Sequence, residues 1–306
     1  MSRSLAVLRG IVAALALAAA MPAASTSDAD YLSDLAAWRK RADDNLRKDL
    51  GWLTIAGRWE LKPGDNTLGS APGNDVVLPR ELAPPRLGKV RVEPDRVTLL
   101  LQPGVHMWTE PEAGKRGDAF TERVLKTKGD DTDWVSSGRL SLYVFTRDDG
   151  KSVLRIADRE SPNRKRFAGR VWYAPRVDMR VPARFVAYPP GTKIPIANVR
   201  GEITEEDAAG RVEVDLAGKR VALDAFAEDD GRLFMILRDE TSGSTTYGAG
   251  RFLVADKPVD GRTTVDFNKA YNPPCAFSAY TTCPLPPPQN WLKMRIEAGE
   301  RYGANH

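Results

Sequence analysis

The sequence predicts an all-β protein, made of two tandem antiparallel β-sandwich or barrel units preceded by one amphipathic helix. Three observations support this fold class. Only one segment, residues 27–49, shows apolar side chains at helical spacing. After Gly51 the apolar side chains alternate with period two in short runs, as in half-buried strands. Pro-Gly, Pro-Asp and Asp-Gly turns bound these runs, and the chain contains 25 glycines and 22 prolines.

The amino-terminal residues 1–25 have the pattern of a cleaved signal peptide. Arg3 and Arg9 precede an apolar run at 11–21, and small residues follow at 22–25. The run is shorter than the roughly twenty residues that span a membrane, so no transmembrane anchor is predicted. The alternative is a buried N-terminal helix. We expect a periplasmic or secreted protein.

The charge of the mature chain does not favour a nucleic-acid partner. Cleavage after residue 25 removes Arg3 and Arg9 and no acid, so the formal net charge falls from +4 to +2. A nearly neutral exported protein has no basic surface of the kind that binds nucleic acid. We therefore predict no nucleic-acid partner.

Residues 27–50 are predicted to form the N-terminal helix. Ser27 or Asp28 can cap it, because both side chains accept hydrogen bonds from the free N–H groups of a first turn. The apolar residues at helical spacing are Tyr31, Leu35, Trp38 and Ala42. We expect this face to pack Trp38 onto a sheet, and the alternative is a helix that binds a partner.

Residues 51–165 are predicted to form the first β unit, with runs such as "GWLTIAG" and "GRLSLYVFTRDDG". Within it, "WELKPGDNTLGSAPGNDVVLP" at 59–79 resembles the opening strands of forkhead-associated sandwich domains. Ser70 stands where those domains carry their phosphothreonine-binding arginine. The resemblance therefore supports a sandwich and gives no support to phosphopeptide binding.

Residues 166–306 are predicted to form the second β unit, an antiparallel meander. "RVEVDL", "RVALDAF" and "RLFMIL" follow one another as strands, and "TYGAGRFLV" and "TVDFN" continue the series. The basic stretch 159–170 separates the two units. One continuous large sheet is the alternative.

The sequence excludes several classes of site. His106 and His306 are the two histidines, and the chain has no G-x-S-x-G, H-E-x-x-H, P-loop or G-x-G-x-x-G motif. We therefore predict no cofactor and no metal. Acidic turns at 130–133 and 228–231 lack the spacing of a calcium loop, and solvated loop acids account for them better.

Cys275 and Cys283 are predicted to form a disulfide. An exported chain matures in an oxidising compartment, and its two cysteines can pair with each other so that no free cysteine is left. Six prolines lie between residues 265 and 290 and restrict the backbone further, so we expect this segment to cross a sheet edge or cover a barrel mouth. The alternative is a nucleophilic or metal-binding pair.

A candidate ligand site lies just before the cysteines. Tyr247 and Arg251 are four residues apart, and Asp266 and Asn268 are two apart, so period two places each pair on one face of its strand. If the strands pair, the four side chains form a polar pocket for an acidic or hydroxylated small ligand or an envelope glycan. The alternative is a buried Arg–Asp pair that only ties two strands together.

A second group of candidates lies in residues 155–173, which include the basic stretch: Arg155, Asp158, Ser161 and Arg164. This group can attract an anionic surface, or can be a solvated linker.

Two further functions stay open. The first is a histidine-independent hydrolase or lyase acting on an envelope glycan, with Asp266 as acid or base and Arg251 or Tyr247 stabilising charge. Glycosidase chemistry needs a second carboxylate, which Asp158 or Asp239 can supply. The second is a structural envelope protein.

Several motifs together carry a family resemblance. "RIADRESPNRKRFAGRVWY", "TYGAGRFL", "DFNKAYNPPCAF", "TCPLPPPQN" and "IEAGE", with the earlier "GWLTIAGRWELKPGDNTLGS", resemble the bacterial family catalogued as domain of unknown function 1684. The resemblance implies no known reaction. It points to the same candidate residues and adds Asn272.

Overall fold

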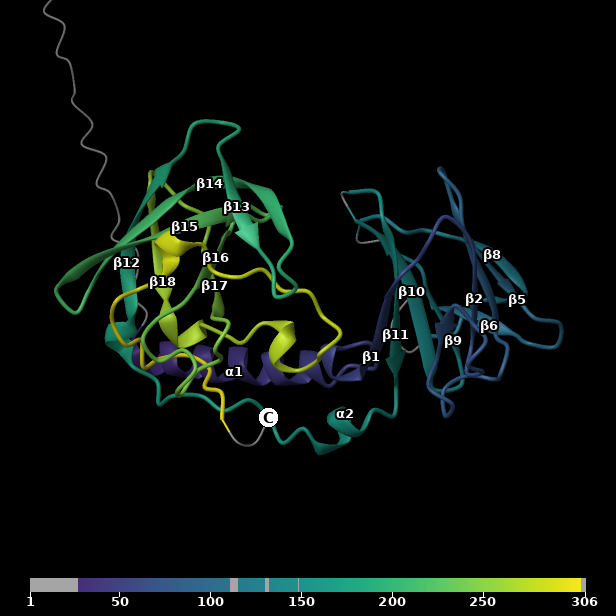
Figure 1. The fold of residues 1–306 in the computed structure, drawn as a ribbon. Helices are drawn as coiled ribbons and strands as arrows, with labels where there is room; N and C mark the ends of the chain where they lie inside the picture. The colour runs from purple at the N-terminus through teal and green to yellow at the C-terminus, as the bar shows by residue number, and fades with distance from the viewer. Residues whose placement is uncertain (1–26, 111–114, 130–131, 148, 304–306) are drawn as a thin grey trace, which may run out of the picture.

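Two groups of β-strands and one long helix dominate this computed structural model, which describes residues 27–110, 115–129, 132–147 and 149–303 (Figure 1). The predicted signal peptide at 1–25 lies outside the described residues. The predicted all-β class with an N-terminal helix is confirmed. We call strands β1–β11 the first β unit and strands β12–β18 the second β unit.

The elements have the following bounds. The helices are α1 (Asp28–Leu46) and α2 (Pro162–Arg166), and the 3-10 helices are η1 (Trp52–Thr54), η2 (Val177–Met179), η3 (Phe267–Lys269), η4 (Pro274–Ala276) and η5 (Pro288–Asn290). The strands of the first β unit are β1 (Ile55–Glu60), β2 (Gly64–Gly69), β3 (Val76–Val77), β4 (Gly88–Val92), β5 (Val97–Leu101), β6 (Met107–Glu110), β7 (Ala119–Phe120), β8 (Glu122–Leu125), β9 (Trp134–Ser137), β10 (Leu140–Thr146) and β11 (Ser152–Asp158). The strands of the second β unit are β12 (Arg180–Ala187), β13 (Lys193–Ala197), β14 (Ile203–Leu216), β15 (Lys219–Ala227), β16 (Leu233–Leu237), β17 (Arg251–Ala255) and β18 (Arg262–Asp266).

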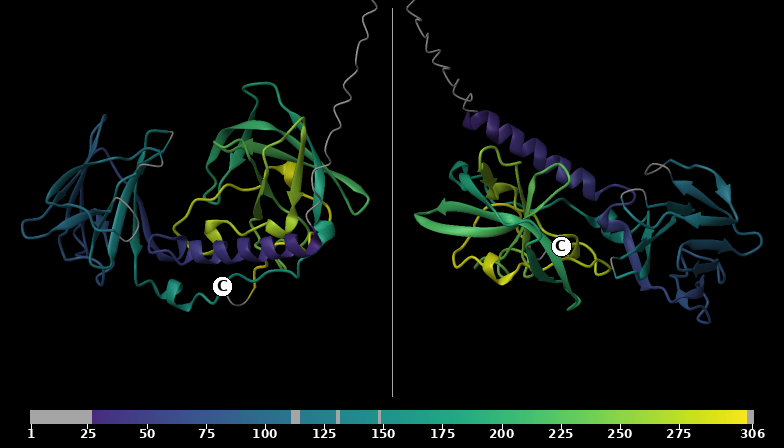
Figure 2. Two further views of the ribbon diagram at one scale, coloured as in Figure 1. Left: turned by 180° about the vertical axis from the view of Figure 1, so that it is seen from behind. Right: turned by 90° about the horizontal axis from the view of Figure 1, so that it is seen from above.

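Helix α1 begins where the sequence predicts. The Ser27 side chain accepts a hydrogen bond from the Asp30 backbone N–H at 3.2 Å, which satisfies one free donor of the first turn. The helix lies along the second β unit (Figures 1 and 2). On this helix the Trp38 ring meets the Trp172 ring edge-on, with 5.6 Å between the ring centroids.

The first β unit is a sandwich of two sheets. One sheet has the order β1-β11-β10-β9-β6-β7 and the other β3-β2-β4-β5-β8. Side chains that alternate along the strands, such as Val90, Leu99, Leu142 and Ile156, are fully buried between the sheets. Period two in the sequence therefore becomes one shared apolar core.

The second β unit is a strongly curved sheet in the order β17-β16-β15-β14-β12-β18, with β13 paired to β14. Its end strands β17 and β18 contact each other, so the sheet encloses a half-barrel core (Figure 1). Val212, Leu223, Met235, Leu253 and Val265 are fully buried in this core.

The predicted disulfide loop, residues 275–283, is closed by the Cys275–Cys283 bond, with 6.1 Å between the Cα atoms. The loop contacts the first β unit. Its Ser278 hydroxyl donates to the Ile55 carbonyl at 3.3 Å. Its Phe277 ring packs with Leu46 and Leu53 in a small apolar cluster. The loop thus joins the second β unit to the end of α1 and to β1.

Polar bonds between the units support this contact. Arg147, which follows β10, donates a hydrogen bond of 2.9 Å to Glu202, which precedes β14. Arg164 of α2 pairs with Asp49 at 2.6 Å and donates to the Arg47 carbonyl at 2.8 Å. The Arg147–Glu202 bond thus joins the two units directly, whereas the Arg164 contacts join α2 to the segment that follows α1.

Replacing both cysteines, Cys275→Ala with Cys283→Ala, should lower the free energy of unfolding by about 2.5 kcal/mol, because the open loop gains denatured-state entropy. Guanidinium unfolding of the variant and of the oxidised wild type measures this difference. A reducing agent should lower the stability of the wild type to that of the variant and leave the variant unchanged. Equal stabilities of variant and oxidised wild type would contradict the prediction.

Candidate functional site

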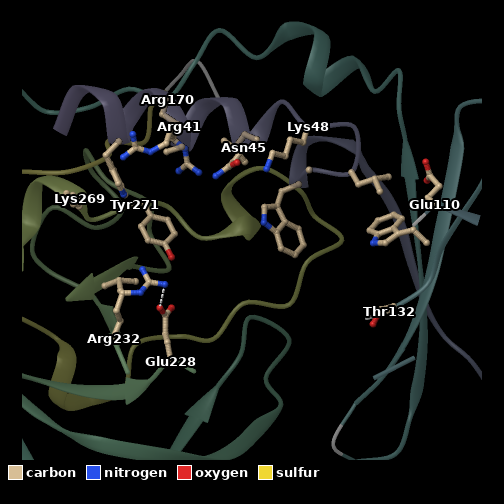
Figure 3. A pocket seen from close by; sticks show the side chains of 18 of the residues that line it. Arg41, Asn45, Lys48, Glu110, Thr132, Arg170, Glu228, Arg232, Lys269 and Tyr271 are labelled. Carbon is tan, nitrogen blue, oxygen red and sulfur yellow. Dashed lines mark ion pairs between the residues drawn. The ribbon is translucent and has the colours of Figure 1, made fainter. Parts of the chain in front are cut away.

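A cleft of about 1360 Å³ lies between the two β units, with one side formed by α1 (Figure 3). Arg41 and Asn45 point into it from α1, and Lys48 from the turn that follows α1. Glu110 and Thr132 border it on the first β unit, and Glu228, Arg232 and Tyr271 on the second. Pockets for drug-sized ligands measure about 300–1,000 Å³, so this cleft has room for a larger ligand.

The lining of the cleft is predominantly positive. It contains seven basic residues, Arg41, Lys48, Arg123, Lys126, Arg170, Arg232 and Lys269, and four acidic ones, Glu110, Asp133, Glu228 and Asp256. Three of the four acids already hold an arginine. Glu110 pairs with Arg159, Asp133 with Arg123 at 3.3 Å, and Glu228 with Arg232 at 2.6 Å.

Three of the basic side chains, Arg41, Lys48 and Lys126, make no ion pair or side-chain hydrogen bond with any described residue. Arg41 and Asn45 are four residues apart on α1, which places them on one helical face, and Lys48 lies just beyond the carboxyl end of the helix. Leu35 and Leu46 of the same helix are buried. The helix therefore presents its cations to the cleft because its apolar side chains anchor it elsewhere.

Aromatic rings lie beside these cations. Trp38, Trp52, Trp134 and Tyr271 all line the cleft. Burial, and then the charge of Glu228, raises the pKa of Tyr271 to about 12, so its hydroxyl is a proton donor at neutral pH. The cleft thus combines cations, one phenol donor and flat apolar surfaces.

A buried polar network lies behind the cleft wall. Glu300 is fully buried, and its Oε2 accepts from Arg170, which lines the cleft, and from the Asn272 backbone N–H at 2.7 Å. Glu300 Oε1 and Asn272 Oδ1 have no hydrogen-bond partner. Burial raises the pKa of the Glu300 carboxyl to about 7 against the opposing charge of Arg170.

The candidate site predicted from the sequence has a different geometry. Arg251 is fully buried, pairs with Asp239 at 2.7 Å and donates to the Ile296 carbonyl at 3.0 Å. Its carboxylate partner is Asp239 and not Asp266, which accepts from Tyr31 instead. The expectation that Arg251 and Asp266 share one open pocket is therefore wrong.

Asp266 and Asn268 form a second sealed network with Tyr31 of α1. The Tyr31 hydroxyl donates to Asp266 Oδ1 at 3.0 Å, and Asn268 Nδ2 donates to the Tyr31 oxygen at 2.9 Å. Strand β18 ends at Asp266 because its carboxylate accepts the Asn268 backbone N–H at 3.1 Å and starts η3. Asp266 and Asn268 come together, but through this turn and not through strand alternation.

Tyr247 and Asn272 lie elsewhere. Tyr247 precedes β17, in a turn closed by Gly250 N–H to its carbonyl, and packs against Tyr302 with 4.9 Å between ring centroids. Asn272 belongs to the Glu300 network. Neither side chain lines the cleft.

The second group of candidates is also dispersed. Asp158 holds Arg139 through two hydrogen bonds of 2.8 and 2.6 Å, whereas Arg164 pairs with Asp49. Ser161 caps α2. Arg155 lies on β11 among aromatic rings and donates to the Tyr143 hydroxyl at 2.6 Å.

The carboxylates proposed for glycosidase chemistry do not border the cleft. Asp158 and Asp239 each hold an arginine, and Asp266 accepts from Tyr31.

Sequence reasoning missed the cations of α1, Tyr271 and the Arg170–Glu300 pair. A signal was present for some of them. Lys269 and Tyr271 alternate with Asn268 and Asn272 in "NKAYN". The pairing of Arg170 with Glu300 spans 130 positions, so no local pattern reports it.

Two absences concern the described residues alone. In that part of the chain no helix is long and apolar enough to cross a membrane. Nor do these ranges contain three or more histidines, cysteines or acids grouped to hold a metal ion.

Comparisons with known proteins cover the carboxy-terminal half. The family described as "Protein of unknown function (DUF1684)" matches residues 165–301. Among solved structures, the solution NMR structure of an uncharacterized protein from Haloarcula marismortui is 34% identical, covers 45% of this chain and 78% of its own, and has a TM-score of 0.38. No curated protein matches. The family match contains Arg170, Tyr271, the disulfide loop and Glu300.

The raised pKa of Glu300 should make stability fall as pH rises. A carboxyl whose folded-state pKa is about 7, above its ordinary 4.5, binds its proton more tightly when folded. Its contribution is complete below about pH 4.5 and is lost by about pH 7, a change of roughly 3 kcal/mol. Glu300→Gln, which also supplies a donor to Asn272, should remove this pH dependence in denaturant unfolding.

The exposed Glu297→Gln is the matched control, because Glu297 pairs only with the exposed Arg295. It should keep the wild-type pH profile. A Glu300→Gln profile that parallels the wild type between pH 4.5 and 7 would contradict the prediction.

Proposed function

This chain belongs to the DUF1684 family, proteins of unknown function, and we propose that it binds an acidic carbohydrate in the cleft between its two β units. One observation carries the proposal. The cleft has an excess of basic side chains, and Arg41, Lys48 and Lys126 have no partner among the described residues. A charged ligand supplies the missing partners.

The chemistry of the lining matches such a ligand. Arginine binds a carboxylate through two parallel hydrogen bonds, and lysine adds a compact positive charge. Asn45 and the Tyr271 hydroxyl are placed to bond sugar hydroxyls. Trp52, which is 38% exposed, and Trp134 offer flat surfaces for the apolar faces of sugar rings.

The size of the cleft favours an oligosaccharide over a single sugar. Its volume of about 1360 Å³ exceeds that of ordinary small-molecule pockets, and its walls come from α1 and from both β units. The sequence predicted a ligand pocket within the second β unit. We propose instead that the ligand binds in the cleft between the two units.

Binding is a better proposal than hydrolysis for this cleft. Three of its four carboxylates are engaged by an arginine and are not free to contact a ligand. The cations, by contrast, are available. We therefore propose a binding protein.

We also propose that the protein works in the periplasm or outside the cell. The pattern of residues 1–25 supports export. The bonded Cys275–Cys283 pair supports an oxidising compartment, where disulfides persist.

The double variant Arg41→Gln with Lys48→Gln should bind trigalacturonate about tenfold more weakly than the wild type, because two charge-assisted contacts are lost. Quenching of tryptophan fluorescence measures binding, since Trp38, Trp52 and Trp134 line the cleft. Affinity of the wild type should fall as salt is raised.

Lys40→Gln is the matched control, because Lys40 lies on the same helix, pairs with Asp44 at 2.7 Å and does not line the cleft. It should bind like the wild type. Maltotriose, a neutral trisaccharide, should bind far more weakly than trigalacturonate. Equal binding of both sugars, or no binding of the acidic one, would refute the proposed function.

A further inference from the structure

A second cationic site lies away from the cleft, on the face of the first β unit that points toward the second. Arg58 of β1 and Arg155 of β11 are directly opposite each other in the strand pair. Cross-strand partners of like charge repel, so this arrangement destabilises the sheet unless something neutralises it.

Neither arginine has a carboxylate partner among the described residues. Arg155 is 7% exposed, and the Nε atoms of both Arg58 and Arg155 are buried without a hydrogen-bond partner. Other buried arginines of this chain do have acids, such as Arg251 with Asp239 and Arg170 with Glu300. Arg58 and Arg155, by contrast, have no acid as an ion-pair partner.

The surroundings add positive charge. Burial, and then the charges of Arg200, Arg155 and Arg147, lowers the pKa of Arg58. Arg147 is already paired, with Glu202 at 2.9 Å and Asp149 at 3.1 Å. Arg200 belongs to the loop between β13 and β14, so the group takes residues from both β units.

Aromatic contacts explain only part of this arrangement. The Arg155 guanidinium lies 5.6 Å from the Trp52 ring centroid and 5.0 Å from that of Phe145, and such contacts stabilise one cation. They do not explain a second cation placed directly opposite. The charge of Glu202 offsets part of the repulsion, but Glu202 already pairs with Arg147 at 2.9 Å.

We propose that Arg58, Arg155 and Arg200 bind a tetrahedral oxyanion, phosphate or sulfate, between the two β units. Such an ion has several oxygens that accept from different guanidinium groups at once, and its charge cancels the repulsion. None of the three arginines lines the cleft, although Arg155 lies 5.6 Å from the ring centroid of Trp52, which does.

The test is thermal unfolding in inorganic phosphate against chloride at equal ionic strength. Phosphate should raise the Tm of the wild type with a saturable dependence, because it binds the folded state. Arg58→Gln should raise the apparent Kd for phosphate at least tenfold, and Arg200→Gln should raise it less. Arg41→Gln with Lys48→Gln should keep the wild-type response, which excludes the cleft as its source.

A second readout separates binding from a structural role. In chloride alone, Arg58→Gln should melt at the wild-type temperature or above it, because the substitution removes repulsion. Melting well below the wild type, a phosphate response no larger than that of chloride, or an unchanged response in Arg58→Gln would each overturn the proposal. Sulfate and glycerol phosphate, compared with phosphate, distinguish a free inorganic ion from the terminal group of an ester.

Discussion

The apolar contact of Phe277 with Leu46 and Leu53 fixes the geometry on which the cleft depends. Leu46 ends α1, Leu53 precedes the first β unit, and Phe277 lies in the disulfide loop of the second β unit. Burying a side chain of this size stabilises by about 1.5–3 kcal/mol, so three of them make a substantial joint. Without it, the cations of α1 and the aromatic side chains of the two units would not face one space.

The disulfide loop stabilises this apolar contact because its backbone is rigid. The Cys275–Cys283 bond and the flanking prolines restrict the backbone before Phe277 meets its partners, so less conformational entropy is lost when the loop docks. The same restraint orders the walls of the cleft in the absence of ligand. A preorganised site loses less free energy to ordering when it binds.

The sequence predicted features that depend on local patterns and missed those that depend on distant partners. Ser27 caps α1, period two produces the sheets, and the cysteines pair. Tyr247 and Arg251 do not share a strand because Gly250 adopts φ +99° between them, a conformation that interrupts extended structure. Asp266 accepts from Tyr31 across 235 positions, and no spacing rule reports such a contact.

In this protein, charged side chains that have a partner of opposite charge serve the fold, whereas those that lack one mark the candidate binding sites. Arg251 with Asp239 and Arg170 with Glu300 are buried and paired, as stability requires, since an unpaired buried charge costs several kcal/mol. The buried Arg155 and the half-buried Arg58 lack such partners among the described residues, and so do the exposed Arg41 and Lys48. Selection for folding alone gives no reason to place Arg58 opposite Arg155, and the same holds for an excess of cations around one cleft. The two proposed anionic ligands would neutralise both groups.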